Sequence, residues 1–150
     1  MLKHLAAVSA AAVVLTVSSF VVLAQSEAPK QSGVALGGYC PVAYVAMNQA
    51  VKGNSQHKSE FQGRTYYLTN ADAKKMFDAD PAKYVPAYDG LCATAVAQGM
   101  KLASDPKLFA VHNGVAYLFS NAEAKTMFEK DKSGIIARAD ANWPKLQQQK

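Results

Sequence analysis

The chain contains two cysteines, Cys40 and Cys92, which are its strongest candidates for chemistry. Thiolate sulfur ligates soft metals, attacks disulfides and forms them. Pro41 suits the first position of a helix, so Cys40 is predicted to cap that helix. Cys92 lies near the start of a second short helix predicted over residues 91–98. Because the positive end of a helix dipole favours the thiolate, we expect both cysteines to be more reactive than ordinary buried ones.

Three chemistries are open for this pair of cysteines. The first is a structural disulfide, which is natural in an exported protein. The second is a soft-metal site in which a methionine or histidine joins two thiolates. Copper(I) is its first candidate because thiolates and thioethers select it, and zinc becomes an option if His57 or His112 takes part. The third is a redox pair that cycles between dithiol and disulfide.

The candidate helper ligands also have simpler interpretations. His57 lies in a polar stretch that is typical of a loop, and His112 precedes a predicted hairpin turn as an ordinary strand residue would. Met47 and Met100 are the methionines nearest to the cysteines in the sequence, and packing would explain them as well. The predicted metal set is Cys40, Cys92, Met100, Met47 and His112.

An internal repeat organises the chain. Gly63–Asp80 aligns without a gap with Gly114–Asp131, at an offset of 51 and with nine of eighteen residues identical. The two cysteines are 52 residues apart, and each lies in a Gly-x-Cys-x-x-Ala pattern, so they belong to the same duplication. A rough two-fold relation between the copies would place the two thiols face to face. Repeated units of this kind usually pack on each other to bury their apolar faces.

Each copy predicts a β-hairpin followed by a helix. The turns are at Gln62–Gly63 and Asn113–Gly114, each between two short apolar runs. Asn70 and Asn121 stand where a helix N-cap would be. An Ala, a Met and a Phe at i, i+3 and i+4 then predict the buried helix face. These residues are Ala73, Met76 and Phe77 in the first copy and Ala124, Met127 and Phe128 in the second.

The predicted fold class is α+β, with two pseudo-symmetric β-hairpin–helix units packed as one domain over residues 36–146. A C-terminal helix is expected over Ile135–Asn142, ending before Pro144, with Trp143 packed on the domain. Residues 25–35 are expected to be a flexible lead-in, and residues 147–150 a tail.

The first 24 residues are typical of a secretory signal peptide. A basic lead precedes an uncharged run that ends in small residues at Ala24. The alternative is an uncleaved anchor, because the run is long enough to span a bilayer. Removing residues 1–24 takes away Lys3 and no acid, so the formal charge falls from +5 to +4. We expect a periplasmic or secreted protein with no stable membrane insertion after cleavage.

Several motifs resemble the exported YHS-domain proteins over residues 36–146. They are Gly38–Tyr44 (GYCPVAY), Phe61–Tyr67 (FQGRTYY), Phe77–Tyr84 (FxxDPxxY), Gly90–Ala93 (GLCA) and Ala139–Pro144 (ADANWP). In part of that family selenocysteine occupies the position of Cys40, and in other members Asp does, which implies a redox or soft-ligand role there.

The resemblance also implies metal binding, since the wider YHS family is associated with heavy-metal ions, copper among them. Its small metal-sensing members carry thiolate ligands at three positions that are Ala43, Thr69 and Ala73 in this chain. A metal would therefore have to use Cys40 and Cys92 instead.

The leading prediction is an extracytoplasmic soft-metal-binding protein, with copper as its ion and a two-cysteine site. A thiol-disulfide redox protein and a non-catalytic module with a structural disulfide are the alternatives. The sequence has no Gly-rich phosphate loop and no locally supported Ser-His-Asp set, so a binding role is favoured over an enzyme. Basic residues are scattered among acids, which argues against nucleic-acid binding, and a homodimer is compatible with the sequence.

Overall fold

The computed structural model of the protein describes residues 33–149. The predicted signal peptide, residues 1–24, and most of the predicted lead-in lie outside these residues. Val34 forms a parallel bridge with Thr65, and Ala35 is buried. The folded part therefore includes residues just before position 36.

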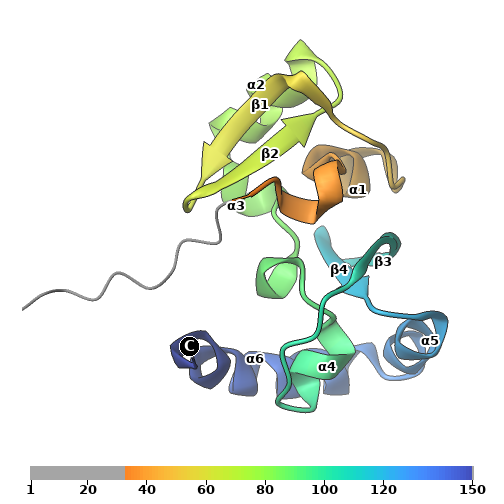
Figure 1. The fold of residues 1–150 in the computed structure, drawn as a ribbon. Coiled ribbons are helices and arrows are strands. Elements are labelled where there is room, and N and C mark those ends of the chain that lie inside the picture. The colour runs from red at the N-terminus through yellow and green to blue at the C-terminus, as the bar shows by residue number, and fades with distance from the viewer. Residues whose placement is uncertain (1–32, 150) are drawn as a thin grey trace, which may run out of the picture.

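The described residues form an α+β fold of two similar units, as the sequence predicts (Figure 1). The first unit consists of η1 (Ala35–Gly38), α1 (Pro41–Met47), β1 (Asn54–Phe61), β2 (Arg64–Leu68), α2 (Ala71–Ala79) and α3 (Pro81–Tyr84). The second consists of η2 (Ala87–Gly90), α4 (Ala93–Ala97), β3 (Asp105–His112), β4 (Val115–Phe119), α5 (Ala122–Lys130) and α6 (Lys132–Gln148). Each unit has its own two-stranded antiparallel sheet.

The two hairpins repeat each other in detail. Both turn residues have positive φ in each hairpin: 50° and 75° at Gln62 and Gly63, and 50° and 76° at Asn113 and Gly114. That conformation matches the twist of the flanking strands. The register shifts between Asn54 and Lys58 in the first hairpin, and at the equivalent place in the second. The duplicated sequence therefore encodes duplicated strand pairing.

The helices after the hairpins confirm the predicted caps. The side chains of Asn70 and Asn121 accept hydrogen bonds from the N–H groups of Ala73 and Ala124, at 2.8 Å each. These bonds satisfy backbone donors that the first helical turn leaves free.

The predicted burial of the two helical methionines is wrong. Phe77 and Phe128 are fully buried, but Met76 and Met127 are 43% and 48% exposed. A helix on a small sheet buries a narrow stripe at i and i+4, and in both units the residue at i+3 lies at its edge. The thioether groups therefore lie at the surface.

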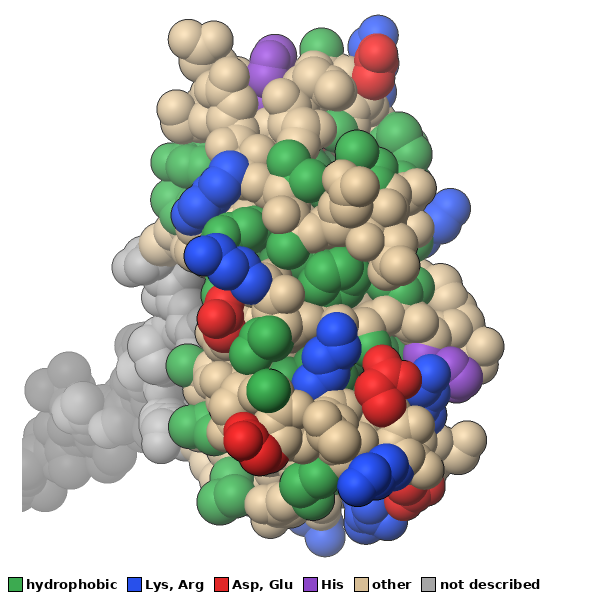
Figure 2. Space-filling view, turned by 90° about the vertical axis from the view of Figure 1, so that its right-hand side faces the viewer, with side chains coloured by type: hydrophobic (Ala, Val, Ile, Leu, Met, Phe, Trp, Pro, Cys, Tyr) green, Lys and Arg blue, Asp and Glu red, His purple; other side chains and the backbone are tan. Residues whose placement is uncertain are grey.

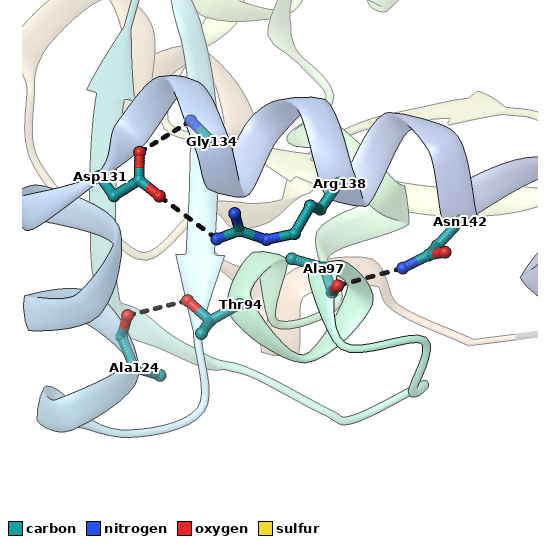
Figure 3. A network of polar contacts seen from close by, with 7 residues as sticks. All are labelled: Thr94, Ala97, Ala124, Asp131, Gly134, Arg138 and Asn142. Carbon is teal, nitrogen blue, oxygen red and sulfur yellow. Dashed lines mark hydrogen bonds and ion pairs between the residues drawn. The ribbon is translucent and has the colours of Figure 1, made fainter.

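The C-terminal helix α6 is longer than predicted. Asp131 caps its start by accepting from the N–H of Gly134 at 3.0 Å, and it also pairs with Arg138 at 3.3 Å (Figure 3). The helix continues through Pro144 to Gln148, so the predicted stop before the proline is wrong. Proline removes one backbone donor, but Leu146, which is 2% exposed, anchors the last turn in the core. Within residues 33–149, no helix combines the length and the apolar character that a membrane crossing needs.

Among residues 33–149, the buried apolar side chains form two clusters. The N-terminal cluster contains the core of the first unit, including Cys40 and Phe77. The C-terminal cluster contains the core of the second unit, including Cys92 and Phe128. Trp143 packs against the second cluster, with its ring 5.8 Å from that of Tyr88, as an anchor of the kind predicted.

Strand β4 belongs to both clusters. Ala116 and Leu118 are part of the N-terminal cluster, whereas Tyr117 and Phe119 are part of the C-terminal one. Alternate side chains of a strand point to opposite faces, so β4 is buried on both sides. The β3–β4 hairpin lies between α1 and the α4–α5 pair (Figure 1). The two units are therefore joined through the β3–β4 hairpin, and its strand β4 contributes side chains to both cores.

Leu118→Ala should lower the free energy of unfolding by about 2–5 kcal/mol, because it leaves a cavity in the N-terminal cluster. Since Leu118 belongs to the second unit but packs in the core of the first, both units should lose stability in one transition. Urea unfolding followed by circular dichroism and by fluorescence of Trp143 measures this. Val115→Ala, on the same strand but 36% exposed, should cost less than about 1 kcal/mol. Separate transitions, or equal losses in the two variants, would contradict the joint role of β4.

Stability should fall at alkaline pH. Burial raises the pKa values of Tyr44 and Tyr88 well above 10, and the Asp140 carboxylate beside Tyr88 raises its pKa further. Because the folded pKa lies above the unfolded one, the stabilisation is complete below the unfolded pKa and is lost as pH rises above it. Unfolding free energies measured between about pH 9 and about pH 11 should decline, and Tyr88→Phe should make that decline shallower. An unchanged slope in this variant would argue against Tyr88 as a source of the effect.

Candidate functional site

Both cysteines occupy the predicted helix starts. Cys40 is the N-cap residue of α1, and Cys92 is the N-cap residue of α4. Each has an extended backbone conformation, and neither side chain makes a capping hydrogen bond. Both are free thiols, with exposed fractions of 0% and 1%.

The structure does not bring the two thiols together. Cys40 lies in the N-terminal cluster, and its N–H donates to the carbonyl of Val51 at 2.8 Å. Cys92 lies in the C-terminal cluster and forms a parallel bridge with Leu118 of β4. The two cysteines are therefore free thiols in different clusters, and strand β4 contributes to both of these clusters.

A cavity of about 210 Å³ lies beside Cys92 and does not include Cys40. It is formed by α4, by the segment after α4 and by the start of α5. Three sulfur-containing side chains line it: Cys92, Met100 and Met127. Cys92 is 1% exposed, whereas Met100 and Met127 are 50% and 48% exposed. The thiol is therefore at the inner end of the cavity and the two thioethers are at its rim.

Cys92 is held by the segment that follows α4 and by the residue that follows β4. The N–H of Cys92 donates to the carbonyl of Leu102 at 2.9 Å. The hydroxyl of Ser120, which directly follows β4, donates to the sulfur of Cys92 at 3.4 Å. This contact helps to fix the direction in which the Cys92 side chain points.

Three hydrogen bonds hold α4 to α5 and α6, and Figure 3 shows those from Thr94 to Ala124 and from Asn142 to Ala97. The hydroxyl of Thr94 on α4 donates to the carbonyl of Ala124 on α5 at 2.8 Å. The amide of Asn142 on α6 donates to the carbonyls of Val96 and Ala97 at 3.1 Å each. Helix α4 is only five residues long, so these bonds to its neighbours set the direction in which Cys92 points.

The charges around the cavity favour a cation. Its lining includes one carboxylate, Glu123, and no Lys or Arg. On the lower half of the face in Figure 2, by contrast, Lys and Arg side chains are interspersed with Asp and Glu. In this cavity of the second unit, three sulfur-containing side chains therefore lie near one carboxylate and no basic side chain.

Comparisons with family models, curated proteins and solved structures found no match to this chain. The resemblance to the exported YHS-domain proteins therefore stays a prediction. The geometry around Cys92 is the remaining indication of function.

The other predicted ligands lie away from this cavity. Met47 ends α1 and is 56% exposed, and His112 ends β3 beside the hairpin turn; neither lines the cavity. His57 lies on strand β1 rather than in a loop. Within residues 33–149, no three His, Cys, Asp or Glu side chains are grouped so that they could hold a metal, so the usual zinc donors are not assembled there.

Met127 is the candidate ligand that sequence reasoning missed. Its helical spacing assigns it to the core, next to Phe128. One sequence signal could have identified it. Met127 lies three residues after Ala124, so it falls at the edge of the buried stripe of α5, on the side that faces the end of α4.

Cys92 should react with iodoacetamide faster than Cys40 in the folded protein, by about an order of magnitude, because it lines a cavity and needs a smaller opening to react. Mass spectrometry of the two cysteine peptides over time measures both rates in one sample. In concentrated urea the two rates should become similar, which controls for intrinsic reactivity. Equal rates in the folded protein, or a faster Cys40, would refute the placement of the cavity.

Proposed function

We propose that the protein is an extracytoplasmic soft-metal-binding protein that holds one copper(I) ion between Cys92, Met100 and Met127. One observation carries this proposal: a thiol and two thioethers line the same cavity. Thiolate and thioether ligands select copper(I) over harder cations. The single carboxylate of Glu123 and the absence of basic side chains in the lining add a favourable field for a cation.

The ligands are suited to a stepwise encounter with the ion. The two methionines are half exposed and have three rotatable bonds each, so they can turn toward an incoming ion at low cost. Cys92 is held in place by backbone contacts and by Ser120. Copper(I) would meet the thioethers first and the thiol last, and the thiol would lose its proton as the metal binds.

This proposal changes the predicted ligand set. It excludes Cys40, Met47 and His112, because they do not line the cavity. It adds Met127, which does. The two disulfide-based alternatives lose support, since both need the two sulfur atoms in contact and the cysteines lie in different clusters. The export assignment rests on the pattern of residues 1–24, and copper binding agrees with what the YHS resemblance implies.

Titration with copper(I) under anaerobic reducing conditions tests the proposal. The protein produced from residue 25 should bind one equivalent and compete with a chromophoric chelator. Cys92→Ser should weaken binding by at least about 100-fold, and Met100→Leu and Met127→Leu by about tenfold each, because each removes a soft donor.

The duplication supplies matched controls for this titration. Met76→Leu and Met47→Leu change similarly exposed methionines of the first unit, and Cys40→Ala removes the other thiol. These variants should bind copper(I) as the unchanged protein does. Stoichiometric binding that depends on Cys40 rather than on Cys92, or no binding at all, would overturn the proposed site.

A further inference from the structure

All four methionines among residues 33–149 are exposed. Met47, Met76, Met100 and Met127 have exposed fractions of 56%, 43%, 50% and 48%. Methionine is among the residues most often buried, so this is an unusual distribution. The four form two pairs, one in each unit, but only Met100 and Met127 line the cavity beside Cys92.

We propose that Met100 and Met127 are oxidation sites through which peroxides control the metal affinity of the cavity. This inference rests on the proposed copper(I) site and adds its regulation. The two methionines at the rim are about half exposed to solvent, whereas Cys92 is 1% exposed. An oxidant that arrives from solution therefore meets the thioethers before it meets the thiol.

The chemical step is a two-electron oxygen transfer. A lone pair of the thioether sulfur attacks one oxygen of hydrogen peroxide, the O–O bond breaks and an S–O bond forms. The departing hydroxide takes the remaining proton and leaves as water. Sulfur is oxidised by two electrons and the peroxide is reduced, so methionine becomes methionine sulfoxide.

The product is a poor ligand for a soft ion. A sulfoxide is polar, and its exposed donor is a hard oxygen, whereas copper(I) prefers soft sulfur. Oxidation of Met100 and Met127 would leave Cys92 as the single soft donor of the cavity. The affinity should then fall without unfolding, because both side chains are already half in solvent and bury little of the core.

The first unit provides an internal control for this effect. Met76 occupies on α2 the repeat position that Met127 occupies on α5, and Met47 ends α1 near the equivalent of Met100. Their exposure is similar, so a peroxide should oxidise all four at similar rates. Neither Met47 nor Met76 lines the cavity, so their oxidation should leave metal binding unchanged.

The test compares two double variants before and after treatment with tert-butyl hydroperoxide. Met47→Leu/Met76→Leu keeps only the rim methionines of the cavity, and Met100→Leu/Met127→Leu keeps only those of the first unit. After treatment the peroxide is removed and the thiols are reduced, which leaves the sulfoxides in place. Peptide mass spectrometry then confirms oxidation, and copper(I) affinity is measured by chelator competition.

Oxidation should weaken copper(I) binding to Met47→Leu/Met76→Leu by about tenfold or more and leave the weaker binding of Met100→Leu/Met127→Leu unchanged. As a second readout, silver(I), a redox-inert substitute for copper(I), should protect Met100 and Met127 of the unchanged protein from oxidation but not Met47 or Met76.

The two modes of failure are distinguishable. If the untreated protein binds no copper(I), the proposed function fails and the inference falls with it. If the untreated protein binds the ion but oxidised Met47→Leu/Met76→Leu binds it equally well, the inference alone is overturned.

Discussion

The burial of strand β4 on both faces is the constraint on which the rest of the structure depends. Its alternating side chains fill two cores, so the strand cannot shift toward one without leaving a void in the other. The residues directly after the strand are fixed as a consequence. Ser120 reaches the sulfur of Cys92, and Asn121 caps α5 and so places Met127. The proposed site is thus assembled at the end of the most constrained strand of the molecule.

The same constraint explains why the cysteines of two similar units have different surroundings. In the first unit, helix α1 serves as the joint: Tyr44 packs 4.9 Å from the ring of Phe109, and its hydroxyl donates to the carbonyl of Pro106 at 2.7 Å. The helix that Cys40 caps therefore packs directly against β3. Helix α4 is held from its sides by α5 and α6 instead. Its N-cap residue, Cys92, lines a cavity, so the two cysteines at equivalent repeat positions have different surroundings.

Local features of the fold were predictable from sequence because each carries its own physical signal. The hairpin turns, the Asn70 and Asn121 caps and the helix start at Pro41 all depend on residues within a few positions. The packing of the two units against each other was not predictable. A duplication indicates that two parts have similar folds, but it does not indicate how they pack together. The face-to-face cysteines failed for this reason. Pro144 predicts a helix stop by its local chemistry alone, but burial of Leu146 outweighs the loss of one backbone hydrogen bond.

The misassigned methionines show how periodicity both informs and misleads about function. A spacing of i, i+3 and i+4 identifies a face, but a nine-residue helix on a two-stranded sheet buries only the centre of that face. A half-exposed methionine contributes roughly half of the burial energy of a core residue, on the order of 1 kcal/mol. Packing alone therefore explains poorly why methionine occupies all four of these positions. At positions 100 and 127 metal binding gives a second explanation for methionine, because the thioethers at the rim and the buried thiol of Cys92 line the same cavity.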